Sequence, residues 1–274
     1  MIRALVLLLI WLCLISDAEA ADLQGRFAQG GMITGKVAPG QDVALDGAPV
    51  KVSADGRFVI GFGRDAELTH SLSVTEDGHP VETLAIILED RDFNIERIDG
   101  LEPDKVTPPP EYRARRQRET GMVGKARAPV TDMMHWADGF IWPAKGRISG
   151  VYGSQRILNG KPRWPHYGVD VAAPAGTPVK APAAGIVRLA QEDFLLEGGI
   201  VIIDHGFGVT STLFHMRKVT VETGQRIRQG DPIGEIGATG RATGAHVDWR
   251  INWRDVRLDP QLLVGDMSQE TPAP

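Results

Sequence analysis

Cysteine is almost absent from this chain of 274 residues, and the only one, Cys13, lies in an apolar run near the start. If that run is removed, the chain has no disulfide, so its hydrophobic cores must be stable without covalent cross-links. Basic residues are not in excess either, because 30 Lys and Arg stand against 35 Asp and Glu, for a formal net charge of −5. This balance argues against a nucleic-acid partner, since general nucleic-acid-binding proteins carry a basic excess.

Aromatic residues are also scarce, at 6%, whereas hydrophobic residues make up 42% and charged residues 24% of the chain. The last two values are ordinary for a globular protein and exclude a wholly disordered chain. The length suits two modest domains better than one. Glycine (32) and proline (18) are frequent, and long runs of helix-forming residues are few. The composition therefore predicts a mainly β protein.

Long hydrophobic runs are absent apart from residues 4–15, which follow the positive charge of Arg3 and precede Ala18-Glu19-Ala20. An apolar run of this length is short for a membrane span, which needs roughly 20 residues. A basic start, a short apolar run and a small-x-small motif are typical of a signal peptide. We predict that residues 1–20 are a signal peptide cleaved near Ala20, with an uncleaved anchor as the alternative. The mature protein is then periplasmic and has no stable membrane insertion.

The rest of the chain divides by its pattern of turns and charges. Residues 21–98 hold short apolar runs separated by Asp-Gly and Pro-Gly turns about every ten residues, which predicts a small β-sandwich domain. Residues 99–134 form a Pro-rich and then basic segment, in which residues 111–128 are expected to be helical. This segment is either a solvated helical linker or a positive patch that faces an anionic polymer or membrane headgroups. Residues 135–265 carry short β-rich runs and predict a single β domain, followed by a tail at 266–274.

Three short segments of the C-terminal domain hold histidines next to apolar strands. His166 and Asp170 are four residues apart, so in extended chain their side chains point to the same face. His205 follows an apolar strand, where it either supports a site or is simply a polar strand end. His215 is the only ionisable residue of a neutral stretch, for which a satisfied core histidine is the default interpretation.

A fourth segment alternates strictly between polar and apolar residues. Its polar positions are His246, Asp248, Arg250 and Asn252, and its apolar positions are Val247, Trp249, Ile251 and Trp253. Such a strand is either a half-exposed sheet strand or the floor of a cleft into which His246 and Asp248 point. The two tryptophans share their face with aliphatic residues, so we expect them in the core.

Taken together, these segments resemble one family, the lysostaphin-type zinc metallopeptidases that cut peptidoglycan. The resemblance covers residues 140–262 and rests on motifs in the family's order. They are His-Tyr-Gly-Val-Asp-Val-Ala-Ala-Pro-Ala-Gly-Thr-Pro-Val (166–179), Ile-Asp-His-Gly (203–206), Phe-His-Met (214–216), and the segment from Gly-Ala-Thr-Gly (237–240) to His-Val-Asp (246–248). The resemblance implies an antiparallel-sheet metallopeptidase domain. It also implies that His166 and Asp170 bind zinc, and that His215 and His246 lie beside the metal-bound water.

The chain departs from the family pattern at Asp248, where the family has the second histidine of His-x-His as its third zinc ligand. Aspartate is a known zinc ligand at about 2.0–2.2 Å, so Asp248 can take that role. Its added negative charge is expected to weaken the Lewis acidity of the metal, which predicts a slower enzyme or a preference for another divalent ion. Arg250, on the same face, is expected to hold Asp248 or to pair with a substrate carboxylate.

We therefore expect a zinc-dependent endopeptidase that hydrolyses peptide bonds in peptidoglycan cross-links or stems. His246 is expected to accept the proton of the attacking water, and His215 to stabilise the tetrahedral intermediate or to donate to the leaving amine. The alternative is a catalytically degenerate envelope factor that binds and activates a separate cell-wall amidase, which the change at Asp248 keeps open. A wall-binding module without a partner enzyme is a third interpretation.

Overall fold

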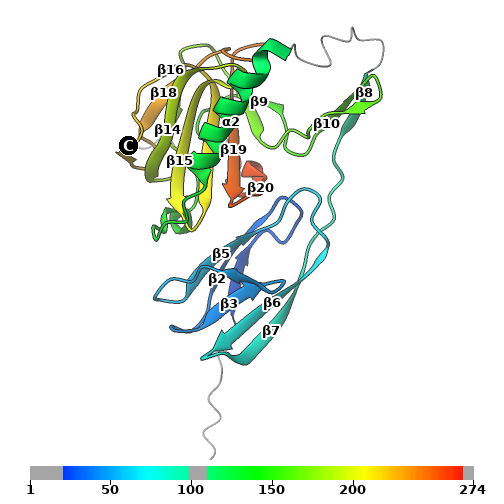
Figure 1. Ribbon diagram of the computed structural model, residues 1–274, viewed down its shortest axis with the longest axis vertical. Coiled ribbons are helices and arrows are strands. Elements are labelled where there is room, and N and C mark those ends of the chain that lie inside the picture. The colour runs from blue at the N-terminus through cyan, green and yellow to red at the C-terminus, as the bar shows by residue number, and fades with distance from the viewer. Residues whose placement is uncertain (1–20, 99–109, 268–274) are drawn as a thin grey trace, which may run out of the picture.

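The computed structural model describes residues 21–98 and 110–267. The predicted signal peptide at 1–20 lies outside the described residues, as does most of the predicted tail. The chain forms a smaller N-terminal part and a larger C-terminal part, both built mainly from strands (Figure 1). No helix within the described residues is long and apolar enough to cross a membrane.

The N-terminal part is a small sandwich of two antiparallel sheets. The first sheet has the order β1-β2-β5 and the second the order β4-β3-β6-β7. The strands are β1 (Asp22–Gly25), β2 (Met32–Lys36), β3 (Asp42–Leu45), β4 (Ala48–Val50), β5 (Arg57–Gly61), β6 (Thr69–Glu76) and β7 (His79–Ile87). Alternate apolar residues of the sheets, among them Ile33, Phe58 and Leu72, are fully buried. The expected β-sandwich is thus confirmed, while the exact domain boundaries stay predictions.

A short three-stranded sheet lies where the N-terminal part gives way to the C-terminal part. β8 (Ile95–Ile98) pairs in parallel with β10 (Gln155–Leu158), which pairs in turn with β11 (Lys161–Pro162). The end of the N-terminal segment is therefore held by strand pairing with residues more than fifty positions further along the chain.

The predicted helix is present as α2 (Arg113–Arg127), which follows the short 3₁₀ turn η1 (Pro110–Tyr112). It is not a freely solvated linker, because it lies along one face of the C-terminal sheet (Figure 1). Ala126 is buried with Leu189 and Ile202, and Met122 and Val123 pack against the same cluster. By packing on strands β14 (Gly185–Phe194) and β15 (Gly198–Gly206), the apolar positions of the helix stabilise this part of the protein.

The C-terminal part is a ten-stranded antiparallel sheet with the main order β17-β14-β15-β16-β19-β12-β9, to which β13, β18 and β20 are joined. Its strands are β9 (Arg147–Gly150), β12 (Val169–Ala172), β13 (Pro178–Lys180), β14 (Gly185–Phe194), β15 (Gly198–Gly206), β16 (Val209–Val219), β17 (Arg226–Ile227), β18 (Pro232–Ile236), β19 (His246–Trp253) and β20 (Val256–Leu258). The remaining helical turns are η2 (His135–Asp138) and η3 (Pro260–Leu262).

The strict alternation in β19 divides its side chains between the core and the opposite face. Val247, Trp249 and Ile251 are fully buried, and Trp253 is nearly so. This confirms that the two tryptophans belong to the core. The polar positions of β19 consequently point to the other face of the sheet, beside the central strands β12 and β16.

Candidate metal centre

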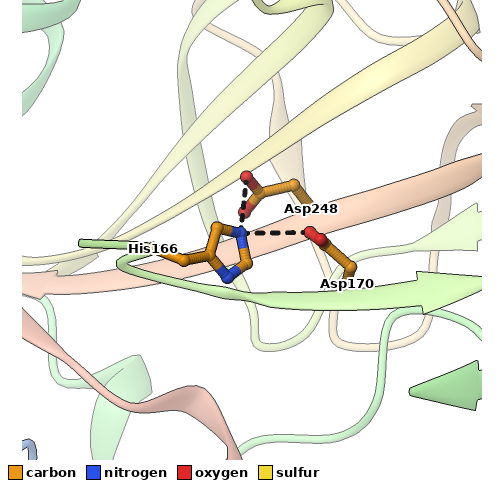
Figure 2. Close-up of side chains that lie close together, drawn as sticks. All are labelled: His166, Asp170 and Asp248. Atoms are coloured by element: carbon orange, nitrogen blue, oxygen red, sulfur yellow. Dashed lines mark hydrogen bonds and ion pairs between the residues drawn. The ribbon is translucent and has the colours of Figure 1, made fainter. Parts of the chain in front are cut away.

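His166, Asp170 and Asp248 come together on the polar face of the C-terminal sheet (Figure 2). His166 Nε2 lies 3.2 Å from Asp170 Oδ1 and 3.3 Å from Asp248 Oδ2. One candidate ligand atom from each residue lies within 4.8 Å of the other two. The three residues that the sequence singled out as ligands are therefore near enough to share one ion.

Strand pairing explains why these side chains meet. β12 pairs with β19 so that Asp170 lies directly opposite Asp248, and paired residues project to the same face. His166 precedes β12, and its backbone N–H donates to the carbonyl of Ser154 at 2.7 Å. This backbone bond fixes the segment before β12 and aims the imidazole at the two carboxylates.

The orientation of the His166 ring leaves one nitrogen for the site. Nδ1 lies 3.3 Å from the carbonyl oxygen of Val151, which can only accept, so Nδ1 carries the proton there. Burial opposes a charged ring, but the hydrogen bonds and negative charges of Asp170 and Asp248 outweigh it and raise the pKa of His166 to about 10. The two carboxylates therefore strongly favour a positive charge at Nε2, which either a proton or a metal ion can supply.

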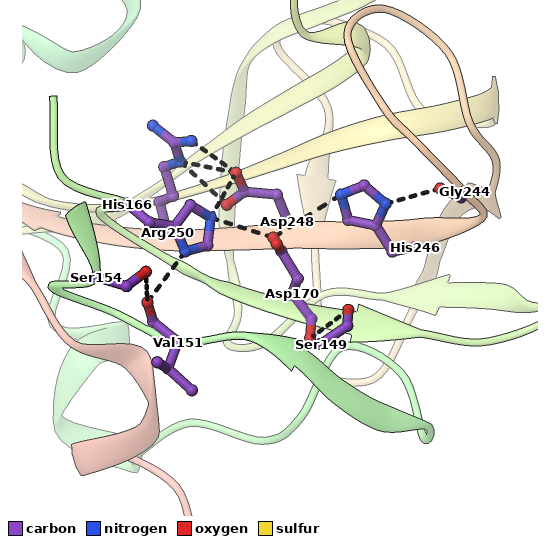
Figure 3. A network of polar contacts seen from close by, with 9 residues as sticks. All are labelled: Ser149, Val151, Ser154, His166, Asp170, Gly244, His246, Asp248 and Arg250. Atoms are coloured by element: carbon purple, nitrogen blue, oxygen red, sulfur yellow. Dashed lines mark hydrogen bonds and ion pairs between the residues drawn. The ribbon is translucent and has the colours of Figure 1, made fainter. Parts of the chain in front are cut away.

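Arg250 holds Asp248 in place (Figure 3). Its Nη2 donates to Asp248 Oδ2 at 2.6 Å and its Nε to Oδ1 at 3.0 Å. Burial alone would raise the pKa of Asp248, yet the charge of Arg250 and the contact with His166 hold this pKa well below its usual range. Of the two roles expected for Arg250, the geometry favours holding Asp248, and this also offsets the charge of the additional carboxylate.

Two glycines that the sequence analysis did not single out make room for the carboxylates. A Cβ at Gly168 would overlap Asp248 Oδ1 and the Arg250 side chain, and a Cβ at Gly150 would overlap Asp170 Oδ2. Gly168 could have been noticed as the glycine between His166 and Asp170. Gly150 could not, because only the pairing of β9 with β12 places it beside Asp170.

His215 and His246 lie next to this cluster, as the resemblance implied. Their ring centroids are 4.7 Å apart, and His246 Nε2 lies 3.9 Å from Asp170 Oδ1. Each Nδ1 lies 2.8 Å from a carbonyl oxygen, that of Thr239 for His215 and that of Gly244 for His246. Each neutral ring therefore carries its proton on Nδ1 and keeps a lone pair on Nε2. Burial lowers the pKa of His215, so this ring is neutral at neutral pH.

An irregularity in β16 brings His215 to this face. Phe214 lies opposite Asp248 in the β16–β19 pairing, so simple alternation would turn His215 to the other side. His215 instead has a φ of 64°, and the pairing with β15 shifts register between Gly199 and Val201. Such a bulge re-aims a side chain, and a positive φ in a histidine is an uncommon conformation that must be supported by its surroundings.

His205 is not brought into the site. It is fully buried, and its ring nitrogens lie 2.7 Å from the Ala184 carbonyl oxygen and 2.8 Å from Ser211 Oγ. Ser211 Oγ also accepts from the Trp249 indole, which belongs to the core face. Burial lowers the pKa of His205 to about 4. Its contacts are those of a neutral core histidine rather than of a residue that supports the metal ligands.

The residues present fit one divalent metal ion. Asp170 Oδ1 is buried, and beyond its close contacts with the His166 and His246 rings it has no hydrogen-bond donor among the described residues, which suits an atom that binds an ion. One imidazole nitrogen and two carboxylate oxygens form a donor set that zinc accepts. The Val151 carbonyl then orients the His166 ring, and Arg250 orients the Asp248 carboxylate. Such hydrogen bonds to the ligands are usual around metal sites.

Comparison with known proteins shows what this arrangement is similar to. Residues 164–260 match the sequence profile of Peptidase family M23. A crystal structure of a Pseudomonas aeruginosa protein described as a peptidase M23 superposes with a TM-score of 0.65 at 27% identity, covering 86% of this chain and 94% of that one. Peptidoglycan DD-endopeptidase ShyA of Vibrio cholerae is 35% identical over 109 residues, which are 39% of this chain and 25% of that protein. Murein hydrolase activator EnvC of Escherichia coli is 34% identical over 126 residues, 46% of this chain and 29% of that protein.

The family match includes the residues of the candidate metal centre, whereas the curated relatives are matched over only a part of their length. The aligned region spans only 22% and 25% of the length of two DD-endopeptidases from Vibrio cholerae. The matched range begins two residues before His166 and ends beyond β20, so it contains every candidate ligand and both neighbouring histidines. The predicted resemblance is thus confirmed for this part of the chain, which matches Peptidase family M23 over residues 164–260.

Proposed function

We propose that this protein is a zinc-dependent endopeptidase that hydrolyses peptide bonds in the peptidoglycan of the bacterial periplasm. The observation that carries the proposal is the convergence of His166, Asp170 and Asp248 within 4.8 Å. Two further histidines lie beside this cluster with their Nε2 lone pairs available. A site with three protein ligands and neighbouring proton acceptors is the arrangement that hydrolytic zinc enzymes use.

His166, Asp170 and Asp248 would hold a divalent ion, which would lower the pKa of a bound water and polarise the scissile carbonyl. Side chains of the protein itself accept and donate the proton of the attacking water. His246 is placed to accept it, because its Nε2 is 3.9 Å from the candidate ligand atom Asp170 Oδ1. His215 is neutral at neutral pH, so it also begins as an acceptor. It becomes a donor to the leaving amine only after it has taken up a proton.

The pairing of Arg250 with Asp248 bears on how fast such an enzyme works. Two carboxylates and one imidazole would neutralise the formal charge of a divalent ion and weaken its effect on water. Arg250 withdraws part of that negative charge through its bonds to both Asp248 oxygens. We therefore propose that Arg250 lets aspartate replace histidine at this position without abolishing activity.

The second candidate function is activation of a separate cell-wall amidase. It is favoured by the substitution at Asp248 and by the 34% identity to a relative described as a murein hydrolase activator. Against it stand four retained residues of the family site, His166, Asp170, His215 and His246. A chain that only binds another enzyme needs neither a metal nor these histidines.

The deciding experiment incubates residues 21–274 with purified peptidoglycan and zinc and profiles the released fragments by mass spectrometry. A chelator-treated sample and a His246→Ala variant run alongside, with His79→Ala, an exposed position at the start of β7, as the matched control. New peptide ends that are lost with chelator and with His246→Ala, but kept with His79→Ala, support the endopeptidase. No cleavage together with no bound metal overturns it, and amidase activation is then assayed with the same preparation.

A further inference from the structure

A cavity of about 390 Å³ opens immediately before the candidate ligand His166. Its lining includes Arg64 and Asp65 from the N-terminal sandwich and Gln155, Arg163, Trp164 and Tyr167 from the C-terminal part. Arg64 joins the two parts, because its Nε donates to the Gly153 carbonyl at 2.8 Å. The cavity therefore lies between the two parts of the molecule, next to the metal centre.

Positive charge around this cavity exceeds the negative charge that could neutralise it. Asp65 lines the cavity and is already paired with Arg64. The Arg163 guanidinium has no hydrogen-bond or ion-pair partner among the residues that the structure describes. Arg257 lies 4.2 Å from the centroid of the Tyr167 ring and 5.9 Å from that of Trp164, and its guanidinium likewise pairs with no described carboxylate. The guanidinium groups of Arg163 and Arg257 are thus available to bind an anionic group of a ligand.

A third arginine reinforces this local excess. Arg241 lies in the segment that leads into β19, whereas Arg163 lies in the segment that leads into β12. Burial, followed by the charge of Arg163, lowers the pKa of Arg241. The positive charges of Arg163 and Arg241 therefore repel one another, and an anion bound near both would relieve that repulsion.

Trp164 gives the same cavity an apolar surface. Its side chain is 83% exposed, although large aromatic side chains usually bury most of their area. It lies two residues before His166 and shares the cavity with Tyr167 and Arg163. Exposed aromatic rings beside arginines are typical of surfaces that bind ligands with an apolar part and a charged part.

We propose that this cavity is a substrate subsite for a peptide segment with a free carboxylate, in which Arg163 binds the carboxylate and Trp164 packs against the adjoining aliphatic part. The proposal rests on the proposed function and names the class of substrate: acidic peptides rather than neutral bridges. It also gives the N-terminal sandwich a role, because Arg64 and Asp65 complete the wall of the subsite.

The test compares two soluble cross-linked peptidoglycan peptides that differ only in whether their free carboxylates are amidated. Kinetics are measured with the wild-type chain, Arg163→Gln and Trp164→Ala. Arg228→Gln, which is exposed and lies by β17 at the far edge of the sheet, is the matched control. Loss of a charge-assisted bond is expected to raise KM about tenfold in Arg163→Gln with little change in kcat. Amidation should raise the wild-type KM by a similar factor and have no further effect in Arg163→Gln.

Binding measured by calorimetry separates this proposal from the endopeptidase itself. A chain that cuts neither peptide but binds the carboxylate form more tightly, in a manner lost with Arg163→Gln, supports the subsite and contradicts the proposed activity. A chain that cuts both peptides equally well, with the KM of Arg163→Gln unchanged, overturns the subsite and leaves the activity standing. Equal losses in Arg163→Gln and Arg228→Gln also overturn it, because they reflect net charge alone.

Discussion

Asp248 and Arg250 are two residues apart on one strand and act as a unit. The Asp248 carboxylate is 3% exposed, and a buried carboxylate is costly unless it is paired. Arg250 supplies that pair, and its own guanidinium lies 4.7 Å from the Phe214 ring centroid. The arginine therefore determines both the position and the charge of the unusual ligand.

Replacing Arg250 by Gln should weaken zinc binding. Removal of a group that orients a metal ligand costs typically about 10–100-fold in affinity. Competition with a chromophoric chelator measures the zinc dissociation constant, and Arg226→Gln in β17 serves as the distant control. An affinity equal to that of the wild type would show that Asp248 needs no such partner.

Gly168→Ala should remove the metal site while leaving the chain folded. The added Cβ would overlap Asp248 Oδ1 and the Arg250 side chain, so the Asp248–Arg250 pair must move. We expect at least a tenfold loss of zinc affinity, as for other changes that misplace a ligand. Gly244→Ala, where a Cβ has open space, is the matched control. Zinc binding by Gly168→Ala at the wild-type level would contradict this account of the site.

His205 should make the protein sensitive to acid. Burial lowers its pKa from 6.5 to about 4, so the unfolded chain binds the proton more readily than the folded chain. The stability is complete above pH 6.5 and is lost as the pH falls towards 4, by about 3 kcal/mol for this residue. Urea unfolding at several pH values should show a smaller decrease in His205→Gln than in the wild type or in His79→Gln. Equal slopes in all three proteins would rule out His205 as the cause.

At the scale of elements, helix α2 is attached to the β14–β15 hairpin by a buried carboxylate. Glu119 is 4% exposed and accepts from Arg115 at 2.7 Å and from the Leu195 backbone N–H at 3.0 Å. Arg116 pairs with Glu119 and also with Glu197, which lies in the same hairpin. The backbone of Glu197 in turn accepts from the His215 N–H at 2.8 Å. The basic segment of the sequence is thus a structural element that supports the hairpin beside the site.

Glu119→Ala should loosen this attachment. The change leaves the Leu195 N–H without its acceptor and removes one partner each from Arg115 and Arg116, which costs about 1–3 kcal/mol of unfolding free energy. Chemical unfolding gives the size of the loss, and hydrogen exchange should localise it to α2 and residues 193–197. Arg118→Ala, on the exposed side of the same helix, is expected to change neither measurement. Faster exchange spread evenly over the sheet would contradict a local role for Glu119.

At the scale of the whole molecule, the N-terminal sandwich and the C-terminal sheet share one buried cluster. Phe58 and Leu72 belong to the same contiguous core as Trp249 and Leu258. Arg91 crosses between the two parts, with its Nη2 donating to Asp259 Oδ2 at 2.8 Å. The wall that the sandwich contributes to the cavity beside His166 is therefore held in a fixed position.

Arg91→Ala should weaken the connection between the two parts. Asp259 is 2% exposed and loses its charged partner, which should lower the unfolding free energy by about 1–3 kcal/mol. Calorimetry is expected to show a lower Tm, with a broader transition as the two parts unfold less cooperatively. Arg26→Ala, which breaks an exposed pair with Glu89, is the control and should have little effect. A wild-type transition in Arg91→Ala would show that apolar packing alone holds the parts together.

Prediction from the sequence succeeded where the pattern is local. The alternation in 246–253 predicted both the core face and the polar face of β19, because neighbouring side chains of a strand point to opposite sides. The even spacing of His166 and Asp170 likewise predicted that they point together. The helix within 111–128 was predicted, but its packing was not, since a mainly charged sequence does not reveal which few positions touch a sheet.

What the sequence by itself determined is therefore the set of chemical groups and the face of each strand on which they stand. Only the tertiary structure decided which groups meet. It placed Asp170 opposite Asp248, turned His215 to the site through a bulge, and kept His205 in the core. It also paired Arg250 with Asp248 and left Arg163 beside the cavity without a partner among the described residues. The reason is that alternation is a property of one strand, whereas register, bulges and the contacts between distant segments arise only when the whole sheet packs.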